Sequence, residues 1–338
     1  MFNKLIISKN NLINNIKQVK HKNPNSKVCA MVKANAYGVG DIQVVNVLND
    51  YVDFWGVACF FEAKRIEDLT SKPILILGAV EKGCVEARFR YACSSLEELK
   101  FLISLNKPIK IHLKVNSGMN RYGFKDLEIF NEGLKLIKSS KLIFEGLFTH
   151  FATIDEFVQV QMERFNRFVV GAHKMGFYPI VHSDNSFVNE KFNHGLDMVR
   201  IGFSLYNRND CGFKAVAKIK SEIVLVQEVS RGELIGYDYR CVAQNGMKVG
   251  IVPLGYADGF DLRLIGMEID HNDCKLKILN ISMDCLMLDI GGTKLKKGDQ
   301  IYFLNKLNSL NKYAQYLSTS PYEVMTKFNS IRAERIIY

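Results

Sequence analysis

The sequence has little of what marks several large classes of protein. No apolar stretch reaches the roughly 18 residues that a membrane helix needs, and the N-terminus MFNKLIISKN lacks the apolar segment of a secretory signal. The eight cysteines form no CxxC pair and mostly lie in apolar runs, as buried reduced thiols do. We therefore expect a cytoplasmic protein that does not bind a membrane.

The excess positive charge is also not concentrated in one part of the sequence. The 45 Lys and Arg residues exceed the 35 Asp and Glu residues by ten, but acidic residues lie among the lysines throughout. A nucleic-acid-binding protein gathers its basic residues on one stripe or motif, so no nucleic acid partner is expected. A hydrophobic fraction of 48% in 338 residues is typical of a globular chain, long enough for one large and one smaller domain.

Eight short apolar runs, separated by segments with helical spacing, fill the first 206 residues. Runs rich in Val, Ile, Leu and Phe without strict alternation are typical of strands buried on both faces. An α/β fold is predicted, with an N-terminal (β/α)8 barrel of the TIM type. The runs are VCAMVKA, FWGVACF, PILILGA, RYACSS, IKIHLKVN, LIFEGLFTHF, IVHSDN and DMVRIG.

Beyond residue 213 strand-like runs follow one another without helices between them. IKSEIVLVQEV, MKVGIVPLG and KLKILNISMDCLMLDI are separated by turn signals such as QNGM, and SPYEVMTKFNS has helical spacing near the end. This pattern predicts a mostly β second domain. The expected domains are residues 1–213 and 214–338, with the first few residues free to pack against the second.

Polar residues lie at the ends of several of the eight runs. In barrels of this type the catalytic residues lie at the C-terminal ends of the strands. Each has an ordinary explanation, such as a solvated lysine, a core histidine, a structural ion pair or a helix cap. His150 and His182 have no third ligand at a recognisable spacing, so no metal is expected. Taken together, the residues indicate a site: Lys33, Lys114, Arg121, His150, His182, Ser186 and Arg200.

A lysine next to a phosphate cradle, with a cation to face an aromatic nitrogen, is what pyridoxal phosphate chemistry requires. The amine forms a Schiff base with the cofactor aldehyde, and small residues beyond the last two strands supply amides and a hydroxyl to the phosphate. GVG after Lys33 does not have the spacing of a dinucleotide fingerprint, which argues against a nicotinamide cofactor.

Nine motifs between residues 31 and 324 are, in chain order, MVKANAYGVG, LKVNSGMNRYG, GLFTHFATIDE, HSDNS, MVRIGFSLY, IGYDYR, GYADGF, SMD and PYEV. In these motifs the chain resembles the alanine racemases, the fold-type III pyridoxal phosphate enzymes. The resemblance implies a barrel followed by a β domain.

The resemblance implies a role for individual residues. Lys33 would hold the cofactor as an aldimine and act as one base, Arg200 would face the ring nitrogen and keep it unprotonated, and His150 would hydrogen-bond near Arg200. The phosphate would be surrounded by Tyr37, Ser186, Gly202, Phe203 and Tyr322.

The substrate end is implied in the same way. Arg121 would bind the substrate carboxylate, held by Lys114 at a position carbamylated in some members of the family. Tyr237 would be the second base, contributed by the other subunit of a homodimer. Met283, Tyr256 and a supporting Asp284 would complete that end.

The chain departs from the family pattern around these groups. Val39 replaces a usual histidine, Asn116 and Ser117 stand where Asp-Thr is common, and Asn120 stands where glycine is common. Asp184 stands before Asn185 where alanine is frequent, and the C-terminal NSIRAERIIY lacks the usual proline. None of these changes removes a reacting group.

The implied function is interconversion of L-alanine and D-alanine by a two-base mechanism, supplying D-alanine for peptidoglycan. A racemase of broader specificity, for serine or a larger amino acid, and a decarboxylase are alternatives on the same fold. A non-catalytic pyridoxal phosphate carrier is a third, but a carrier needs neither the second domain nor Tyr237.

Overall fold

The structure is a computed structural model that describes all residues except 207, 209, 330 and 331. The chain divides into two compact units, each of which is discontinuous in sequence. The barrel unit comprises Ile13–Ala36 and Val44–Leu205, and the β unit comprises Met1–Leu12, Tyr37–Gln43 and Tyr206–Tyr338. The domain boundary after residue 213 stays a sequence prediction.

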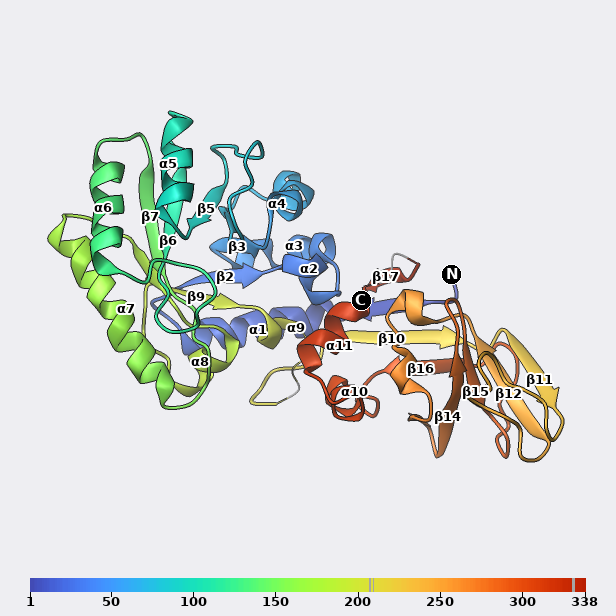
Figure 1. Cartoon of the computed structure of the whole chain (residues 1–338). Coiled ribbons are helices and arrows are strands. Elements are labelled where there is room, and N and C mark those ends of the chain that lie inside the picture. Colours follow the sequence, from blue (N-terminus) through green and yellow to red (C-terminus); the bar gives the residue numbers. More distant parts are fainter. Residues whose placement is uncertain (207, 209, 330–331) are drawn as a thin grey trace. The chain divides into compact units, whose positions relative to one another are not determined.

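The barrel unit contains a closed barrel of eight parallel strands, as predicted (Figure 1). Each predicted apolar run overlaps one strand, and pairing of the first strand with the last, Lys27 opposite Met198, closes the barrel. The strands are β2 (Lys27–Met31), β3 (Phe54–Val57), β4 (Ile74–Ile76), β5 (Arg90–Cys93), β6 (Lys110–Lys114), β7 (Ile143–Phe148), β8 (Ile180–His182) and β9 (Met198–Ile201).

Helices alternate with these strands except between β4 and β5, where residues 77–89 form no helix although a helical segment was expected between each pair of runs. Several helices begin at a side chain that caps their free amides. Ser95, Asp126 and Asn185 each accept hydrogen bonds from the first turn of the helix that follows. No helix among the described residues is both long and apolar enough to cross a membrane. The helices up to residue 206 are α1 (Lys9–Lys22), α2 (Lys33–Tyr37), α3 (Asp41–Leu48), η1 (Asn49–Tyr51), α4 (Phe60–Ile66), η2 (Glu67–Leu69), α5 (Leu96–Ser104), α6 (Leu127–Lys138), α7 (Phe157–Lys174), α8 (Ser186–Lys191) and α9 (Phe203–Tyr206).

The interior of the barrel is not uniformly apolar. Trp55, the single tryptophan, is fully buried, and so are the imidazoles of His112 and His182. Gly146 on β7 makes room for one of them, because a Cβ there would lie 2.2 Å from Nδ1 of His112. A polar layer is therefore built into the packing of the barrel.

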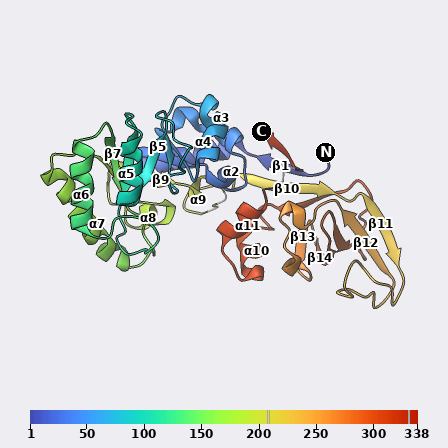
Figure 2. The same cartoon turned by 45° about the horizontal axis from the view of Figure 1, so that its top comes forward.

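The β unit holds two sheets, with strand orders β16-β10-β1-β17 and β11-β12-β15-β14-β13. Figure 2 shows β11 beside β12, its antiparallel neighbour. The strands are β1 (Lys4–Ile7), β10 (Ala217–Glu222), β11 (Leu225–Val229), β12 (Met247–Val252), β13 (Glu268–His271), β14 (Cys274–Ile281), β15 (Leu286–Asp289), β16 (Gln300–Leu304) and β17 (Glu334–Ile337). The helices are η3 (Tyr256–Asp258), η4 (Leu262–Leu264), α10 (Leu310–Leu317) and α11 (Pro321–Lys327).

The mostly β character was predicted, but one detail differs from the sequence interpretation. The run IKSEIVLVQEV is divided into β10 and β11, which belong to different sheets. The first residues were expected to be free to pack against the second domain, but their strand partner was not predicted: β1 pairs in parallel with β17 from the end of the chain, Lys4 lying opposite Glu334. Two short strands so far apart in sequence carry no local signal of their pairing.

Candidate active site

Lys33 follows β2 at the start of a turn with unusual backbone geometry. The next residues, Ala34, Asn35, Ala36 and Tyr37, have φ values of 52°, 52°, 51° and 57°. Four successive residues other than glycine in the left-handed region cost on the order of 1 to 2 kcal/mol each. Such strain is typical of functional sites, where the surroundings hold it in place.

The Glu62 carboxylate is one of the groups that hold this turn. Its two oxygens accept hydrogen bonds from the backbone N–H of Ala34 and of Ala58, both at 2.7 Å. The Lys33 side chain still reaches solvent, but the surrounding protein lowers its pKa. The charges of Arg121 and Arg200 lower this pKa further, against the opposing effect of Glu62.

Four cations of the barrel unit lie close enough to influence one another. Burial, followed by the charges of Arg121, Arg200 and Lys33, lowers the pKa of Lys114 to about 8. Burial and the same cations lower the pKa of His150 to about 3, so this imidazole is neutral at neutral pH. The site therefore attracts anions, lowers the pKa of both of its amines and keeps its imidazole neutral.

Arg200 on β9 is buried, and every hydrogen bond that its side chain makes to described residues involves its two terminal nitrogens. One donates to Nδ1 of His182 at 2.6 Å. The other donates to the carbonyl oxygens of Thr149 and Ser183 at 2.8 and 3.0 Å, and lies 3.5 Å from Nδ1 of His150. The Nε–H of Arg200 is left for another acceptor.

The hydrogen bonds continue from Arg200 across the barrel interior. Nε2 of His182 lies 2.8 Å from Nδ1 of His112, and Nε2 of His112 lies 3.2 Å from the Glu145 carboxylate. Burial lowers the pKa of both histidines, so both are neutral. Because a guanidinium only donates, each imidazole accepts at Nδ1 and donates from Nε2, which fixes both tautomers.

Ser186, at the start of α8, faces the backbone that leads from β9 into α9. Its Oγ accepts hydrogen bonds from the N–H groups of Gly202 and Ser204 at 3.2 and 3.3 Å, with Phe203 between them in sequence. The Ser204 hydroxyl is buried, and its oxygen has no hydrogen-bond partner in the part of the chain that the structure describes. Two amides and two hydroxyls thus gather at the ends of β8 and β9.

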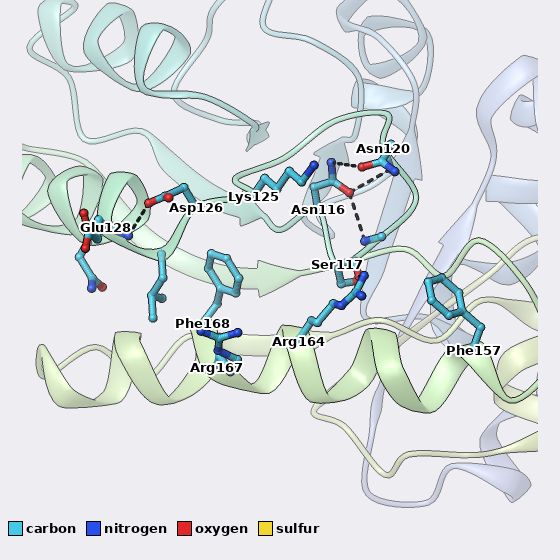
Figure 3. Close-up of a pocket in the computed structure, with 13 residues that line it drawn as sticks. Asn116, Ser117, Asn120, Lys125, Asp126, Glu128, Phe157, Arg164, Arg167 and Phe168 are labelled. Atoms are coloured by element: carbon cyan, nitrogen blue, oxygen red, sulfur yellow. Dashed lines mark hydrogen bonds between the residues drawn. The ribbon is translucent and has the colours of Figure 1, made fainter.

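The loop from β6 to Arg121 is held by Asn116 and Asn120 (Figure 3). The Asn116 side chain accepts from the N–H groups of Gly118 and Asn120 at 3.2 and 3.0 Å, and its amide nitrogen donates to Asn120 Oδ1. Asn120 has a φ of 55°, a conformation that asparagine tolerates better than most residues other than glycine. Its presence where glycine was expected is therefore compatible with the turn.

Two features lie next to this loop. A pocket of about 780 Å³ is lined in part by Asn116, Arg164 and Arg167. The Lys114 ammonium lies 5.0 Å from the ring centroid of Tyr122 and 5.6 Å from that of Phe148. These rings give the buried ammonium a cation–π environment.

Tyr37 and Tyr322 belong to the β unit and lie near each other there. Their ring centroids are 6.3 Å apart, and the Tyr206 ring lies 5.3 Å from that of Tyr37 in a tilted arrangement. Burial raises the pKa of both Tyr37 and Tyr322, so both stay neutral phenols that can donate a hydrogen bond.

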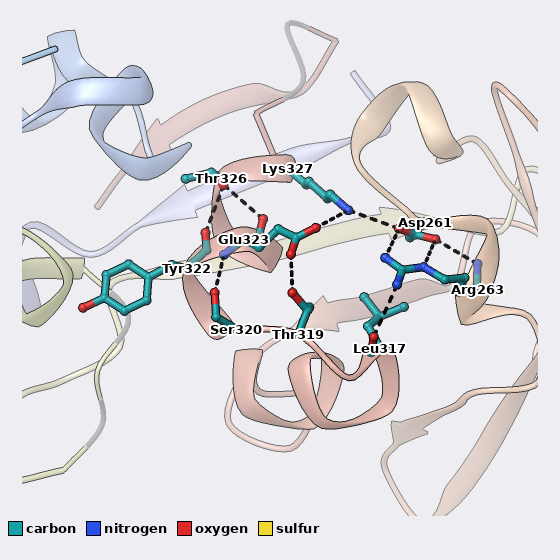
Figure 4. A network of polar contacts seen from close by, with 9 residues as sticks. All are labelled: Asp261, Arg263, Leu317, Thr319, Ser320, Tyr322, Glu323, Thr326 and Lys327. Atoms are coloured by element: carbon teal, nitrogen blue, oxygen red, sulfur yellow. Dashed lines mark hydrogen bonds and ion pairs between the residues drawn. The ribbon is translucent and has the colours of Figure 1, made fainter. Parts of the chain in front are cut away.

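Helix α11, which carries Tyr322, is fixed by polar contacts (Figure 4). Ser320 caps the helix by accepting from the N–H of Glu323 at 3.3 Å. Lys327 bridges Glu323 and Asp261 at 2.9 and 3.1 Å. The Tyr322 side chain points away from this network in the figure.

The other candidates of the β unit lie on neighbouring segments. The N–H of Tyr256 donates to Ser282 O, next to Met283, and the Asn280 side chain donates to the carbonyl oxygen of Tyr237 at 3.1 Å. The side chains themselves are exposed: Tyr237 is 68% and Met283 52% accessible. Asp284, in contrast, forms an ion pair with Arg332.

Sequence reasoning missed several groups of this site. His112 and Glu145 lie inside the apolar runs IKIHLKVN and LIFEGLF, and Ser204 lies in the MVRIGFSLY motif. A charged or imidazole side chain within a buried strand run is a usable signal, because burial requires a partner. Val39, which stands where the family usually has histidine, lies in the β unit. Its carbonyl oxygen accepts a hydrogen bond from the Arg335 side chain at 3.2 Å.

Comparison with known protein families and structures agrees with this geometry. Residues 7–210 match the description "Alanine racemase, N-terminal domain" and residues 216–337 match "Alanine racemase, C-terminal domain". The chain belongs to the alanine racemase family. The resemblance inferred from the sequence motifs is thereby confirmed.

Individual alanine racemases are similar over almost their full length. The protein of Francisella philomiragia is 31% identical, over 97% of this chain and 98% of its own. The alanine racemase structure from E. faecalis is 26% identical with a TM-score of 0.91, over 100% of this chain and 98% of its own. An alanine racemase structure from Bartonella henselae, described as containing covalently bound pyridoxal phosphate, shares the fold at 22% identity and a TM-score of 0.88, and each chain is covered completely.

Proposed function

We propose that this member of the alanine racemase family interconverts L-alanine and D-alanine with pyridoxal phosphate as cofactor. The observation that carries the proposal is Lys33 itself. It is an amine with a lowered pKa on a strained turn, in the field of Arg121 and Arg200. A lysine with a lowered pKa loses its proton more readily, and its free amine is a nucleophile toward an aldehyde and a base toward a C–H bond.

The described residues suit the aldehyde, the ring nitrogen and the phosphate of this cofactor. The amine of Lys33 suits the aldehyde, and the Nε–H of Arg200 suits the ring nitrogen. The Ser204 hydroxyl, which has no partner among the described residues, suits a phosphate, and the amides of Gly202 and Ser204, which donate to Ser186 Oγ in this structure, would be shared with it. The remaining phosphate ligands in this proposal are Ser186, Phe203 by its amide, Tyr37 and Tyr322.

Pyridoxal phosphate, when bound, withdraws electrons from the substrate Cα and so makes its proton acidic. Arg200 keeps its charge at neutral pH, because burial lowers its pKa only to about 10. It therefore donates a hydrogen bond to the ring nitrogen without giving up a proton. Arg121 binds the substrate carboxylate, and Lys33 removes or returns the proton on one face of Cα.

Racemisation also needs a base on the opposite face. We assign this role to Tyr237 from a second copy of the chain, with Tyr256 and Met283 beside it. Exposed aromatic and methionine side chains on neighbouring segments favour a surface that another subunit covers. The enzyme is then a homodimer in which each site draws residues from both subunits.

A coupled assay for D-alanine formed from L-alanine tests this function directly. We expect turnover of alanine to exceed that of serine, lysine and arginine, because Tyr322 and Met283 are bulky. Faster turnover of a larger amino acid would support the broader racemase instead. Bound cofactor without turnover of any amino acid would support the carrier.

The cellular role follows from the product. A cytoplasmic racemase that supplies D-alanine for peptidoglycan predicts that cells lacking it need external D-alanine to grow. Growth of such cells without D-alanine would assign the enzyme another role, such as the use of D-alanine as a nutrient.

A further inference from the structure

Asp184, which is buried, pairs with His194, which is half-buried, next to residues of the proposed site. Asp184 is 1% exposed, and its carboxylate lies 2.8 Å from Nδ1 of His194 and accepts from the N–H of His194 at 3.1 Å. The Ser183 hydroxyl donates a third hydrogen bond at 2.8 Å. Burial alone would raise the pKa of Asp184, but the hydrogen bonds from His194 outweigh it and lower the pKa.

The backbone around Asp184 connects the pair with two groups of the proposed site. The carbonyl oxygens of Ser183 and Asp184 accept from the Arg200 guanidinium and from the Arg200 N–H, both at 3.0 Å. Two residues further on, Ser186 receives the amides of Gly202 and Ser204. The segment 183–186 therefore touches both ends of the proposed cofactor site.

The other end of the pair is anchored in an apolar cluster. The His194 ring lies 5.4 Å from Phe151 and 5.9 Å from Phe192, which pack with Val158 and Val188. Its Nε2 is buried and has no hydrogen-bond partner in the described part of the chain. The polar function of His194 is thus confined to Nδ1, which donates to Asp184.

We propose that Asp184 and His194 are a positioning pair for the cofactor, in which Nδ1–H of His194 holds the Asp184 carboxylate and with it the segment 183–186. This inference rests on the proposed function, because it assigns the pair a share of the affinity for pyridoxal phosphate. Neither residue touches the cofactor in this proposal. Both act through Arg200 and Ser186, whose positions the segment fixes.

The geometry distinguishes the hydrogen bond from simple packing. In His194→Asn the amide nitrogen occupies nearly the position of Nδ1, whereas in His194→Gln it lies nearer that of Nε2. His194→Phe keeps the aromatic packing and removes the donor. Asp184→Asn keeps the shape of the acceptor and removes its charge.

The test measures the dissociation constant of pyridoxal phosphate from each variant by visible absorbance, together with Tm with and without the cofactor. We expect His194→Asn to stay within about threefold of the unmodified protein. His194→Gln, His194→Phe and Asp184→Asn should bind roughly tenfold more weakly or worse, because hydrogen bonds to charged groups are among the strongest. His173→Asn, at an exposed histidine of α7, is the control and should change nothing.

Equal affinity in all variants, with only Tm lowered, would reduce the pair to a structural contact. Equal loss in His194→Asn and His194→Gln would also overturn the proposal, and this comparison stands even where His194→Phe fails to fold. If the unmodified protein bound no pyridoxal phosphate, the proposed function would fail. Binding by the unmodified protein with no difference among the variants would remove this inference alone.

Discussion

Arg200 in the barrel unit and Tyr237 in the β unit are held in opposite ways. Arg200 is buried, and its side chain donates to His182, Thr149 and Ser183. Tyr237 is 68% exposed, and its hydroxyl makes no hydrogen bond to any described residue. A catalytic group must be held in place to act, so under the proposed function Arg200 is positioned within one chain, whereas Tyr237 needs contacts from a second copy.

The largest effect on activity should come from Lys33, the central residue of the part of the site that the barrel unit supplies. Lys33→Ala should lower racemisation at least about 1000-fold, because it removes both the covalent anchor and one base. Borohydride reduction of the unmodified holoenzyme, followed by peptide mass mapping, should place the pyridoxyl group on Lys33. Lys125→Ala, at an exposed lysine, is the matched control and should keep its activity. Label on another lysine would contradict the assignment.

A smaller effect should come from Glu145, the last group in the row of hydrogen bonds that runs from Arg200 through His182 and His112. Burial alone would raise the pKa of Glu145, but hydrogen bonds from His112 and Lys110 lower it to about 2. A depressed carboxyl pKa stabilises the fold above the unfolded value near 4.5, and this stability is lost as pH falls toward 2. Glu145→Gln should therefore lower the free energy of unfolding by roughly 2 to 3 kcal/mol at pH 7, a difference that narrows below about pH 4.5.

Urea unfolding followed by the fluorescence of Trp55, the single tryptophan and a barrel residue, measures this difference. Glu228→Gln, at an exposed glutamate of β11, should show no such dependence on pH. A difference that stayed constant from pH 7 to pH 2.5 would mean that the Glu145 charge does not stabilise the barrel.

The smallest effect should come from the loop that leads to Arg121. Asn120 has a φ of 55°, so Asn120→Gly should change the free energy of unfolding by less than about 0.5 kcal/mol, whereas Asn120→Ala should cost about 1 kcal/mol. The same Trp55 fluorescence measures both. Equal stability of the two variants would show that the left-handed conformation is not retained in solution.

The barrel share of the site was largely accessible from the sequence. Buried parallel strands are continuous apolar runs, so the residues that end them, such as Lys33 and Lys114, fall on one rim. The inward direction of His112 and Glu145 was not accessible, because an apolar run does not say which face of the strand a polar residue occupies. The pairing of β1 with β17 escaped for a different reason, since it joins the two ends of the chain.

The candidate site residues of the β unit could be predicted only from the family motifs. Nothing in the spacing of IGYDYR or SMD distinguishes Tyr237 or Met283 from ordinary surface residues, and the fold of one chain leaves them exposed. Their exposure is the physical signal that remains, and in the proposed function a second copy of the chain covers them.

Mixing two inactive variants, Lys33→Ala and Tyr237→Phe, tests this claim most directly. After the subunits are dissociated and reassociated at random, half of the dimers are mixed, and each mixed dimer contains one site with both lesions and one with neither. Racemase activity should therefore return to about a quarter of the unmodified level. A mixture that stays inactive, although mixed dimers have formed, would contradict a site shared between subunits.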